Sequence, residues 1–213
     1  MTSIKEINLK SNKSQKLKTY SSFSYIFKRF FEVSIIIVLL PIIFLLSLYS
    51  VYKIKKESQG SIIFKQTRVG LDRKTFICLK FRSMHEDSEF NPYTQNNDSR
   101  IFPYGLIMRK YRIDELPQLW NVIKGDMHLV GPRAEWDILV EEYENTIPRY
   151  NKRHLVKPGI TGLAQVSFPY GRNIDDTKKK LKYDLEYIEN WSIFLEFKVA
   201  IKTVLVILGK KGI

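Results

Sequence analysis

Residues 33–52 read VSIIIVLLPIIFLLSLYSVY, a run that contains no charged side chain. A straight helix of this length would reach about 30 Å, which matches the hydrocarbon core of a bilayer. The run begins too late for a signal peptide, lacks a small-residue cleavage site and ends against Lys53. The sequence therefore predicts a membrane segment that stays in the mature protein.

Two features of this segment leave its path open. Pro41 lies near its middle, where it removes a backbone hydrogen bond at a cost of about 3 kcal/mol in a regular helix. Basic residues flank both ends: Lys28, Arg29, Lys53, Lys55 and Lys56. A crossing helix usually has its Lys and Arg excess on one side only. A kinked span and a re-entrant helix that returns to the same face both fit these observations.

Composition limits the class of protein. The chain has 213 residues, a net charge of +13 and a pI near 9.7. This length suits one domain with a membrane segment, and the charge indicates an anionic partner: nucleic acid, acidic lipid or a phosphorylated substrate. The lone Cys78 excludes an internal disulfide, and the three histidines lack zinc-ligand spacing. No glycine-rich phosphate loop of either common pattern is present, which disfavours ATP, GTP and NAD binding.

The remaining sequence predicts an α+β fold that is mostly helical. Residues 61–68 and 75–82 have the pattern of two short strands joined by a turn at 69–74, so they predict a β-hairpin. Helices are expected at 114–124, 135–150, 175–190 and 193–208, with a polar loop at 86–100 and a turn-rich break at 158–162. Charges inside 193–208 argue against a span, so this helix is expected in the core or in the membrane interface.

Residues 112–122, RIDELPQLWNV, place Asp114 and Glu115 at an expected helix start. A helix dipole favours an ionised carboxylate there by about 0.3–1 kcal/mol, which would keep Asp114 ready to attack phosphorus or to bind Mg²⁺. Adjacent helical residues point about 100° apart, so the carboxylates converge only if Asp114 lies just outside the regular helix. An acidic pair is also a common way to begin a helix, and this structural interpretation stays open.

Basic side chains near this pair are candidates to bind phosphate. The guanidinium fork suits bidentate contact with phosphate oxygens, which favours Arg109, Arg112 and Arg133. Lys80 and Arg82 end the second predicted strand and are candidates for the same role, or for contact with lipid headgroups. The alternative for each of them is a solvated surface charge.

Several segments, in this order, resemble the bacterial sugar transferase family, the monotopic phosphoglycosyl transferases that begin glycan assembly on a polyprenyl phosphate. The matching segments are 28–56, 64–70 (FKQTRVG), 80–84 (KFRSM), 114–122, 125–127 (GDM), 129–133 (LVGPR), 158–166 (PGITGLAQV) and 184–188 (DLEYI). The chain departs from the pattern at Glu32 and Glu196, where aspartate is frequent, and at Ala134, where proline is usual. We expect Glu32 still to pair with local basic residues.

The resemblance implies transfer of a sugar-1-phosphate from a UDP-sugar to polyprenyl (undecaprenyl) phosphate. The carboxylate that matches Asp114 attacks the sugar-linked phosphate, releases UMP and forms a phosphosugar–enzyme intermediate, with Glu115 in a supporting role. Mg²⁺ is implied as the cofactor, with Asp114 as its protein ligand. Lys80, Arg109 and Arg133 match positions near the family's active site, and Gln165 is predicted with them to bind substrate.

The resemblance also implies a basic polar leader (1–27), a re-entrant membrane helix bent at Pro41 (28–56) and a membrane-surface phosphoglycosyl transferase domain (57–213). Lys28 and Arg29 are expected to anchor that helix at the membrane. The expected location is the bacterial inner membrane, with the catalytic domain on the cytoplasmic face. The expected partners are the donor, the acceptor and membrane lipid, without nucleic acid, and a homodimer is compatible with the sequence. The product would begin polysaccharide assembly, such as capsule or lipopolysaccharide.

Longer members of the family carry further membrane helices ahead of this part, so the chain is expected to be the minimal form. Two other interpretations stay open on the residues alone. A basic module that binds a membrane surface or nucleic acid without catalysis would have the same charge and aromatic content. An inactive relative that scaffolds other glycan enzymes would share the motifs, although the intact pair of Asp114 and Glu115 favours activity.

Overall fold

The computed structural model describes residues 22–88, 98–168 and 174–209. The described part is mostly helical and contains two small sheets, which confirms the predicted α+β class. The elements are α1 (Ser22–Glu57), β1 (Ile63–Val69), η1 (Leu71–Arg73), β2 (Thr75–Phe81), α2 (Pro103–Lys110), η2 (Ile113–Glu115), α3 (Gln118–Lys124), β3 (His128–Val130), α4 (Asp137–Thr146), η3 (Tyr150–Leu155), β4 (Gly159–Thr161), α5 (Leu163–Ser167), α6 (Ile174–Glu189) and α7 (Ile193–Leu208). Residues 1–21 of the predicted leader and residues 89–97 of the predicted loop lie outside the described residues, whereas residues 22–27 form the start of α1.

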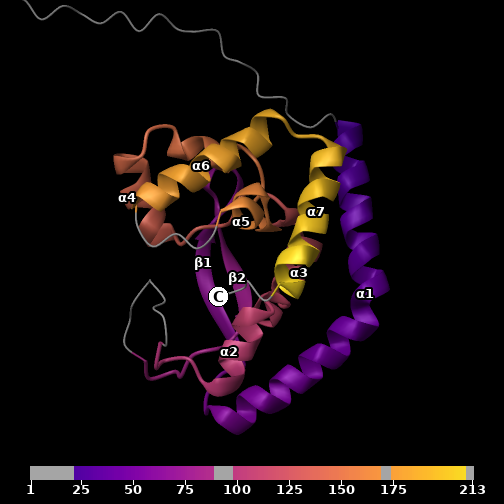
Figure 1. The fold of residues 1–213 in the computed structure, drawn as a ribbon, viewed down its shortest axis with the longest axis vertical. Helices are drawn as coiled ribbons and strands as arrows, with labels where there is room; N and C mark the ends of the chain where they lie inside the picture. Colours follow the sequence, from indigo (N-terminus) through magenta and orange to yellow (C-terminus); the bar gives the residue numbers. More distant parts are fainter. Residues whose placement is uncertain (1–21, 89–97, 169–173, 210–213) are drawn as a thin grey trace, which may run out of the picture.

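Helix α1 is continuous and bent, with Pro41 inside it (Figure 1). Its N-terminal arm contacts α3 and β3, and its C-terminal arm contacts α2. Ile36 and Ile54 are buried, one in each arm, whereas the apolar residues 37–42 between the arms are exposed. Within the described chain, α1 is the one helix long and apolar enough to cross a membrane. Both arms therefore rest on one body, and the exposed middle of the helix is apolar.

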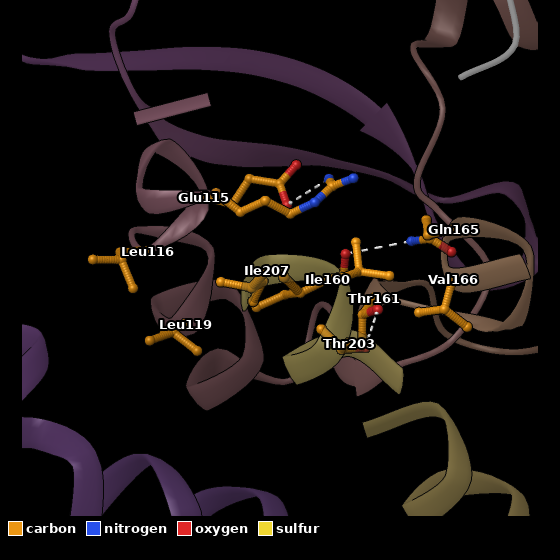
Figure 2. Close-up of a pocket in the computed structure, with 11 residues that line it drawn as sticks. Glu115, Leu116, Leu119, Ile160, Thr161, Gln165, Val166, Thr203 and Ile207 are labelled. Carbon is orange, nitrogen blue, oxygen red and sulfur yellow. Dashed lines mark hydrogen bonds and ion pairs between the residues drawn. The ribbon is translucent and has the colours of Figure 1, made fainter. Parts of the chain in front are cut away.

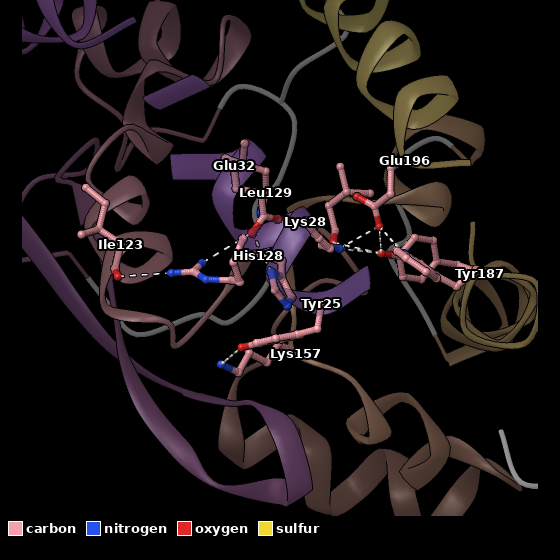
Figure 3. A network of polar contacts seen from close by, with 12 residues as sticks. Tyr25, Lys28, Glu32, Ile123, His128, Leu129, Lys157, Tyr187 and Glu196 are labelled. Atoms are coloured by element: carbon pink, nitrogen blue, oxygen red, sulfur yellow. Dashed lines mark hydrogen bonds and ion pairs between the residues drawn. The ribbon is translucent and has the colours of Figure 1, made fainter. Parts of the chain in front are cut away.

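Buried polar contacts attach the N-terminal arm of α1 to the body (Figure 3). Lys28 is 2% exposed, and its Nζ donates to the Val130 carbonyl at 2.9 Å and to Glu196 Oε1 of α7 at 2.7 Å. Trp191 Nε1 donates to the same Glu196 oxygen at 2.6 Å. Lys28 is thus buried against α7 and β3 in the described structure.

A second contact fixes the same arm one turn further on. Glu32 accepts a hydrogen bond from the Leu129 N–H at 2.8 Å, and its other oxygen lies 2.7 Å from His128 Nδ1. Arg29 Nη1 lies 3.4 Å from the same carboxylate, and Arg29 Nη2 donates to the Ile123 carbonyl at 3.3 Å. The expectation that Glu32 still pairs with local basic residues is confirmed.

The predicted β-hairpin is confirmed. Strands β1 and β2 are antiparallel, with Ile63 opposite Phe81 and Val69 opposite Thr75. The short η1 helix forms the connection, and Asp72 and Arg73 within it have positive φ values of 51° and 61°. Figure 1 shows the hairpin within the concave side of α1.

The segment predicted as a turn-rich break at 158–162 contains strand β4, which pairs in parallel with β3. The prediction was wrong because a three-residue strand shows no periodicity, and its partner lies far away in sequence. Glycines allow the two backbones to approach. A Cβ on Gly159 would lie 2.1 Å from the Gly131 nitrogen, so no side chain fits there.

The predicted helix at 114–124 was wrong at its start. Helix α3 begins only at Gln118, and the preceding residues form the tighter η2 turn. In that turn the Glu115 N–H donates to the Arg112 carbonyl at 3.2 Å. Pro117 precedes α3 and has no N–H to continue the ladder. Asp114 is therefore not a helix cap, and a helix dipole does not set its charge.

The other predicted helices are present as α4, α6 and α7, whereas α2 and α5 were not predicted. Helices α4 and α6 pack with β1 in one core cluster that includes Val69, Val140 and Leu181. Helix α7 buries Val199, so one face belongs to the core. Its other face exposes large apolar side chains: Phe194, Phe197, Ile201, Val204, Leu205 and Leu208.

Candidate active site

The candidate site forms around the η2 turn, between α2 and α3. Arg112 has a left-handed φ of 56°, which reverses the chain directly before the acidic pair. Asn121 of α3 fixes β2 beside this turn: its Oδ1 accepts the Leu79 N–H at 3.0 Å and its Nδ2 donates to the Ile77 carbonyl at 2.7 Å. These contacts place Lys80 of β2 next to the turn.

Glu115 lies at the centre of the site and is 4% exposed. Its Oε1 accepts from Lys80 Nζ at 3.3 Å and from Arg133 Nη1 at 3.0 Å. Its Oε2 accepts from Arg112 Nη1 at 3.5 Å. Three predicted phosphate-binding cations are thus brought together by one carboxylate.

Asp114 is also buried, with an exposed fraction of 9%, but its environment differs from that of Glu115. Among the described residues, its carboxylate takes part in no ion pair. Lys80, Arg109 and Arg133 are near enough for their charges to lower its pKa. Arg109 Nε donates to Ser83 Oγ at 2.9 Å, which holds this guanidinium on the side of β2. Asp114 is thus a carboxylate surrounded by cations that are not paired with it.

The pKa values of the two carboxyls are shifted in opposite directions. Burial alone would raise the pKa of Glu115, but the cations of Arg133, Lys80 and Arg112 outweigh burial and hold it well below the ordinary value. Burial raises the pKa of Asp114; the Lys80 cation opposes this shift, and the charge of Glu115 adds to it. Glu115 is therefore the fixed anion of the pair, and Asp114 is the more basic carboxyl.

The donor set at Asp114 fits Mg²⁺ in one particular manner. Mg²⁺ prefers one or two carboxylates together with phosphate oxygens and water. Asp114 supplies one carboxylate without an ion-pair partner in the described chain, whereas Glu115 already binds three cations. The described residues hold no group of three or more metal-binding side chains. The residues therefore fit a Mg²⁺ ion that shares its coordination with a bound phosphate, rather than a closed protein cage.

Arg82, also predicted to bind substrate, is not brought to the acidic pair. It is 5% exposed, and all three nitrogens of its guanidinium donate hydrogen bonds to the segment that follows α1. Nε donates to the Ser61 carbonyl at 2.5 Å, while Nη1 and Nη2 donate to Ser58 Oγ and the Ser58 carbonyl at 2.9 and 3.0 Å. Arg82 joins the end of β2 to the segment that follows α1.

Gln165 lines a pocket of about 170 Å³ that adjoins the acidic pair. Figure 2 shows Glu115 at one side of this pocket and Gln165 at the opposite side. Gln165 Nε2 donates to the Ile160 carbonyl at 3.3 Å, and its Oε1 is buried without a partner in the described structure. Gln165 is thus a wall residue of the pocket and does not contact Asp114.

Sequence reasoning missed Arg68 of β1. Arg68, Lys80 and Arg133 line one small cavity behind the acidic pair. Arg68 Nη1 donates to the Ala134 carbonyl at 2.9 Å, which fixes the chain directly after Arg133. The available signal was the matching segment 64–70, because a single arginine in a predicted strand has no pattern of its own.

A buried ion pair supports the backbone of Arg133. Arg153 Nη2 donates to the Arg133 carbonyl at 2.8 Å and lies 2.9 Å from Asp184 Oδ2 of α6. Burial raises the pKa of Asp184 to about 6, although the Arg153 cation opposes the shift. The sequence signal for this support was the matching segment 184–188, in which Asp184 comes first.

An acidic pair ringed by arginines and lysine is suited to the binding and transfer of phosphorylated groups. The family model for bacterial sugar transferases matches residues 23–210. The chain belongs to the bacterial sugar transferase family.

Two relatives whose names state a reaction, and one uncharacterized relative, match most of the chain. The UDP-N-acetylgalactosamine-undecaprenyl-phosphate N-acetylgalactosaminephosphotransferase of Aeromonas hydrophila is 41% identical over 187 residues, 87% of this chain and 44% of that protein. The UDP-glucose:undecaprenyl-phosphate glucose-1-phosphate transferase of Xanthomonas campestris pv. campestris is 40% identical over 163 residues, 74% of this chain and 34% of that protein. The uncharacterized sugar transferase EpsL of Bacillus subtilis (strain 168) is 38% identical over 188 residues, 88% of this chain and 90% of that protein. The chain thus spans less than half the length of the first two relatives.

Proposed function

We propose that this protein transfers a sugar-1-phosphate from a UDP-sugar to polyprenyl phosphate and releases UMP. The observation that carries the proposal is the unequal acidic pair. Glu115 gathers Lys80, Arg112 and Arg133, while the adjacent Asp114 has no ion-pair partner in the described chain. Relatives whose names state phosphosugar transfer to undecaprenyl phosphate support the transfer itself.

The proposed reaction has two displacements at one phosphorus atom. The Asp114 carboxylate attacks the phosphorus that bears the sugar, and the bond to the bridging diphosphate oxygen breaks, so UMP leaves with the electron pair. An oxygen of polyprenyl phosphate then attacks the same phosphorus. The bond to Asp114 breaks, which frees the carboxylate and yields polyprenyl-diphospho-sugar.

Cations of the chain stabilise the negative charge that gathers during both displacements. Lys80, Arg109 and Arg133 surround Asp114, and Arg112 stands on the far side of Glu115. When bound to Asp114 and the donor phosphates, Mg²⁺ would supply further charge neutralisation. Glu115 keeps the arginines oriented before substrate arrives, so little reorganisation accompanies the reaction.

We place the protein on the cytoplasmic face of the bacterial inner membrane, with α1 as a re-entrant helix. Both arms of α1 rest on one body, and its exposed middle is apolar. At the C-terminal flank, Lys55 and Lys56 are exposed, which suits contact with an anionic membrane surface. At the N-terminal flank, Lys28 is buried against Glu196 and Arg29 is bonded to Glu32, so these two cations attach the helix to the body instead. The acceptor lipid would reach the site from that surface.

UMP release by the detergent-solubilised protein tests the proposal directly. The assay uses undecaprenyl phosphate, Mg²⁺ and a panel of UDP-sugars. We expect release with at least one sugar, and loss of release on removal of Mg²⁺ or in Asp114→Asn, a nearly isosteric change that leaves the fold intact. Absence of release with every sugar from a folded protein that also binds no UDP-sugar would contradict the proposal and favour a non-catalytic module.

A further inference from the structure

The pocket beside Glu115 is an apolar cavity with charge at one edge only. Leu116, Leu119 and Ile207 form part of its wall, and the Glu115 carboxylate stands at its rim (Figure 2). Arg112 also lines the pocket from that rim. An occupant that matches this distribution is an amphiphile with an anionic head and an apolar body.

The hydroxyl groups in the wall do not require a polar occupant. Thr161 Oγ1 and Thr203 Oγ1 lie 2.7 Å apart, and Thr203 Oγ1 donates to the Val199 carbonyl at 2.8 Å. Each hydroxyl therefore already has a partner within the protein. Gln165 is the remaining polar side chain of the lining away from the charged edge; its Nε2 donates to the Ile160 carbonyl, and its Oε1 has no partner in the described structure. A sugar in the apolar part of the pocket would therefore find few partners for its several hydroxyls, which is unfavourable.

The size of the pocket matches a small branched hydrocarbon. Its volume is about 170 Å³. Engineered cavities of about 150 Å³ with similar aliphatic walls stay dry and bind benzene, which has six carbons. The pocket therefore has room for about one isoprene unit of five carbons.

Helix α7 connects the pocket to the apolar outer surface. Val206 and Ile207 of α7 face the pocket, whereas Val204, Leu205 and Leu208 on the same helix are exposed. A lipid chain that leaves the pocket past the C-terminal turn of α7 thus meets these apolar side chains.

We propose that this pocket holds the phosphate-linked isoprene unit of the acceptor lipid, with Arg112 beside the acceptor phosphate. The inference rests on the proposed function and adds a binding site for the apolar part of the acceptor. The remaining isoprene units run out past α7 into the membrane. The pocket thereby sets the depth at which the acceptor phosphate meets the phosphosugar on Asp114.

Two single-turnover measurements on the full chain separate this inference from the proposed function. The burst of UMP with UDP-sugar alone reports the first displacement, and discharge of the loaded enzyme by acceptor reports the second. Val206→Phe fills the pocket, and Ile138→Phe introduces the same side chain on the exposed side of α4, away from the pocket and from the lipid path along α7. We expect Val206→Phe to raise the half-saturating concentration of both undecaprenyl and farnesyl phosphate by about tenfold or more, with an unchanged UMP burst. We expect Ile138→Phe to change neither value.

If the acceptor discharges the loaded, folded Val206→Phe variant at unchanged concentrations, the acceptor does not occupy this pocket and the inference is overturned. Equal loss of the burst would assign the pocket to the donor and would also overturn it. Absence of a burst in the unaltered protein would contradict the proposed function itself.

A second measurement needs no variant. Farnesyl phosphate that carries a photoreactive diazirine on its first isoprene unit should label α7 or α3, and undecaprenyl phosphate should compete with this labelling. Labelling confined to α1 would contradict the inference.

Discussion

At the scale of single residues, two adjacent carboxyls have pKa values shifted in opposite directions because their neighbours differ. Glu115 is fixed by Lys80, Arg112 and Arg133, while Asp114 is buried with a raised pKa. A nucleophile that is already ion-paired would have to break that contact before attack. The structure thus supports Asp114 as the reacting group and Glu115 as the residue that positions the cations.

Glu115→Gln tests this division of tasks. Loss of the charge leaves Lys80, Arg112 and Arg133 without their shared anion, and these cations then turn towards Asp114. We expect UMP release to fall by about 100-fold or more, because the reacting group is misplaced, and the free energy of unfolding to fall by about 3 kcal/mol.

The matched control is Glu189→Gln, which breaks an exposed pair with Arg149 at 3.0 Å and should change stability by less than about 1 kcal/mol. The assays are UMP release and chemical denaturation followed by tryptophan fluorescence. Full activity in Glu115→Gln would contradict the positioning role.

The sequence predicted the acidic pair and most of its cations, because these residues fall in short local motifs. It did not predict that Arg82 bonds to Ser58 and Ser61 instead of joining the site. Strand alternation gives the face of a side chain but not its partner. Arg68 was missed for the related reason that its contact at Ala134 comes from a distant segment.

At the scale of elements, α1 and α7 are joined by a buried ion pair. Lys28 and Glu196 lie 2.7 Å apart, with side-chain exposures of 2% and 11%. The same lysine donates a hydrogen bond to the Val130 carbonyl, three residues before Arg133. The attachment of the apolar helix is therefore coupled to the position of a cation in the candidate site.

A double-mutant cycle tests this attachment. Lys28→Met leaves Glu196 buried without its cation, so we expect a loss of about 3–5 kcal/mol in the free energy of unfolding. The double variant Lys28→Met/Glu196→Met removes both charges, and we expect it to be more stable than Lys28→Met alone. Chemical denaturation of each protein in detergent measures these differences. The cycle also includes Glu196→Met alone. If the effects of Lys28→Met and Glu196→Met on the free energy of unfolding simply add in the double variant, the pair is not coupled.

The bend of α1 predicts its membrane topology. Two variants of the Cys78→Ala protein each carry one cysteine, Phe27→Cys in the N-terminal arm of α1 or Ser61→Cys after its C-terminal arm. Both cysteines should react with a membrane-impermeant maleimide added to the same side of the membrane. Pro41→Leu restores a backbone hydrogen bond and removes the ring clash, worth about 3 kcal/mol in a regular helix. We expect this change to increase the fraction of molecules whose two sites label from opposite sides. Opposite-side labelling in the unaltered helix would contradict the re-entrant arrangement.

Elements with a local pattern were predictable and elements made by distant contacts were not. The hairpin and helices α6 and α7 follow strand alternation, turn residues and helical periodicity within one segment. The β3–β4 pair depends on close approach of Gly131 and Gly159. The acidic side chains of η2 are buried among cations that come from β2, from α2 and from the loop after β3. Neither feature is encoded in a local pattern.

At the scale of the whole molecule, His154 predicts how stability depends on pH. Burial, and then the cations of Arg153 and Arg73, lower its pKa to about 4. The unfolded chain binds this proton below about pH 6.5, whereas the folded chain binds it only near pH 4. The contribution is therefore complete above pH 6.5 and is lost as the pH falls towards 4, up to about 3 kcal/mol.

His154→Gln removes this titration. We expect the free energy of unfolding of the variant to fall less than that of the unaltered protein between pH 6.5 and pH 4. The difference between the two curves isolates His154, because Glu135 and Asp184 titrate in both proteins. Denaturation midpoints in detergent across this range measure it, and parallel curves would contradict the depressed pKa.

The measurement that tests the central claim most directly is the mass of the intact protein after incubation with UDP-sugar and Mg²⁺ in the absence of acceptor. The proposed mechanism predicts a gain equal to one phosphosugar, located at Asp114, absent from Asp114→Asn and lost when polyprenyl phosphate is added. UMP release that requires the acceptor and never produces this gain would show direct transfer between the substrates and would contradict an Asp114 intermediate.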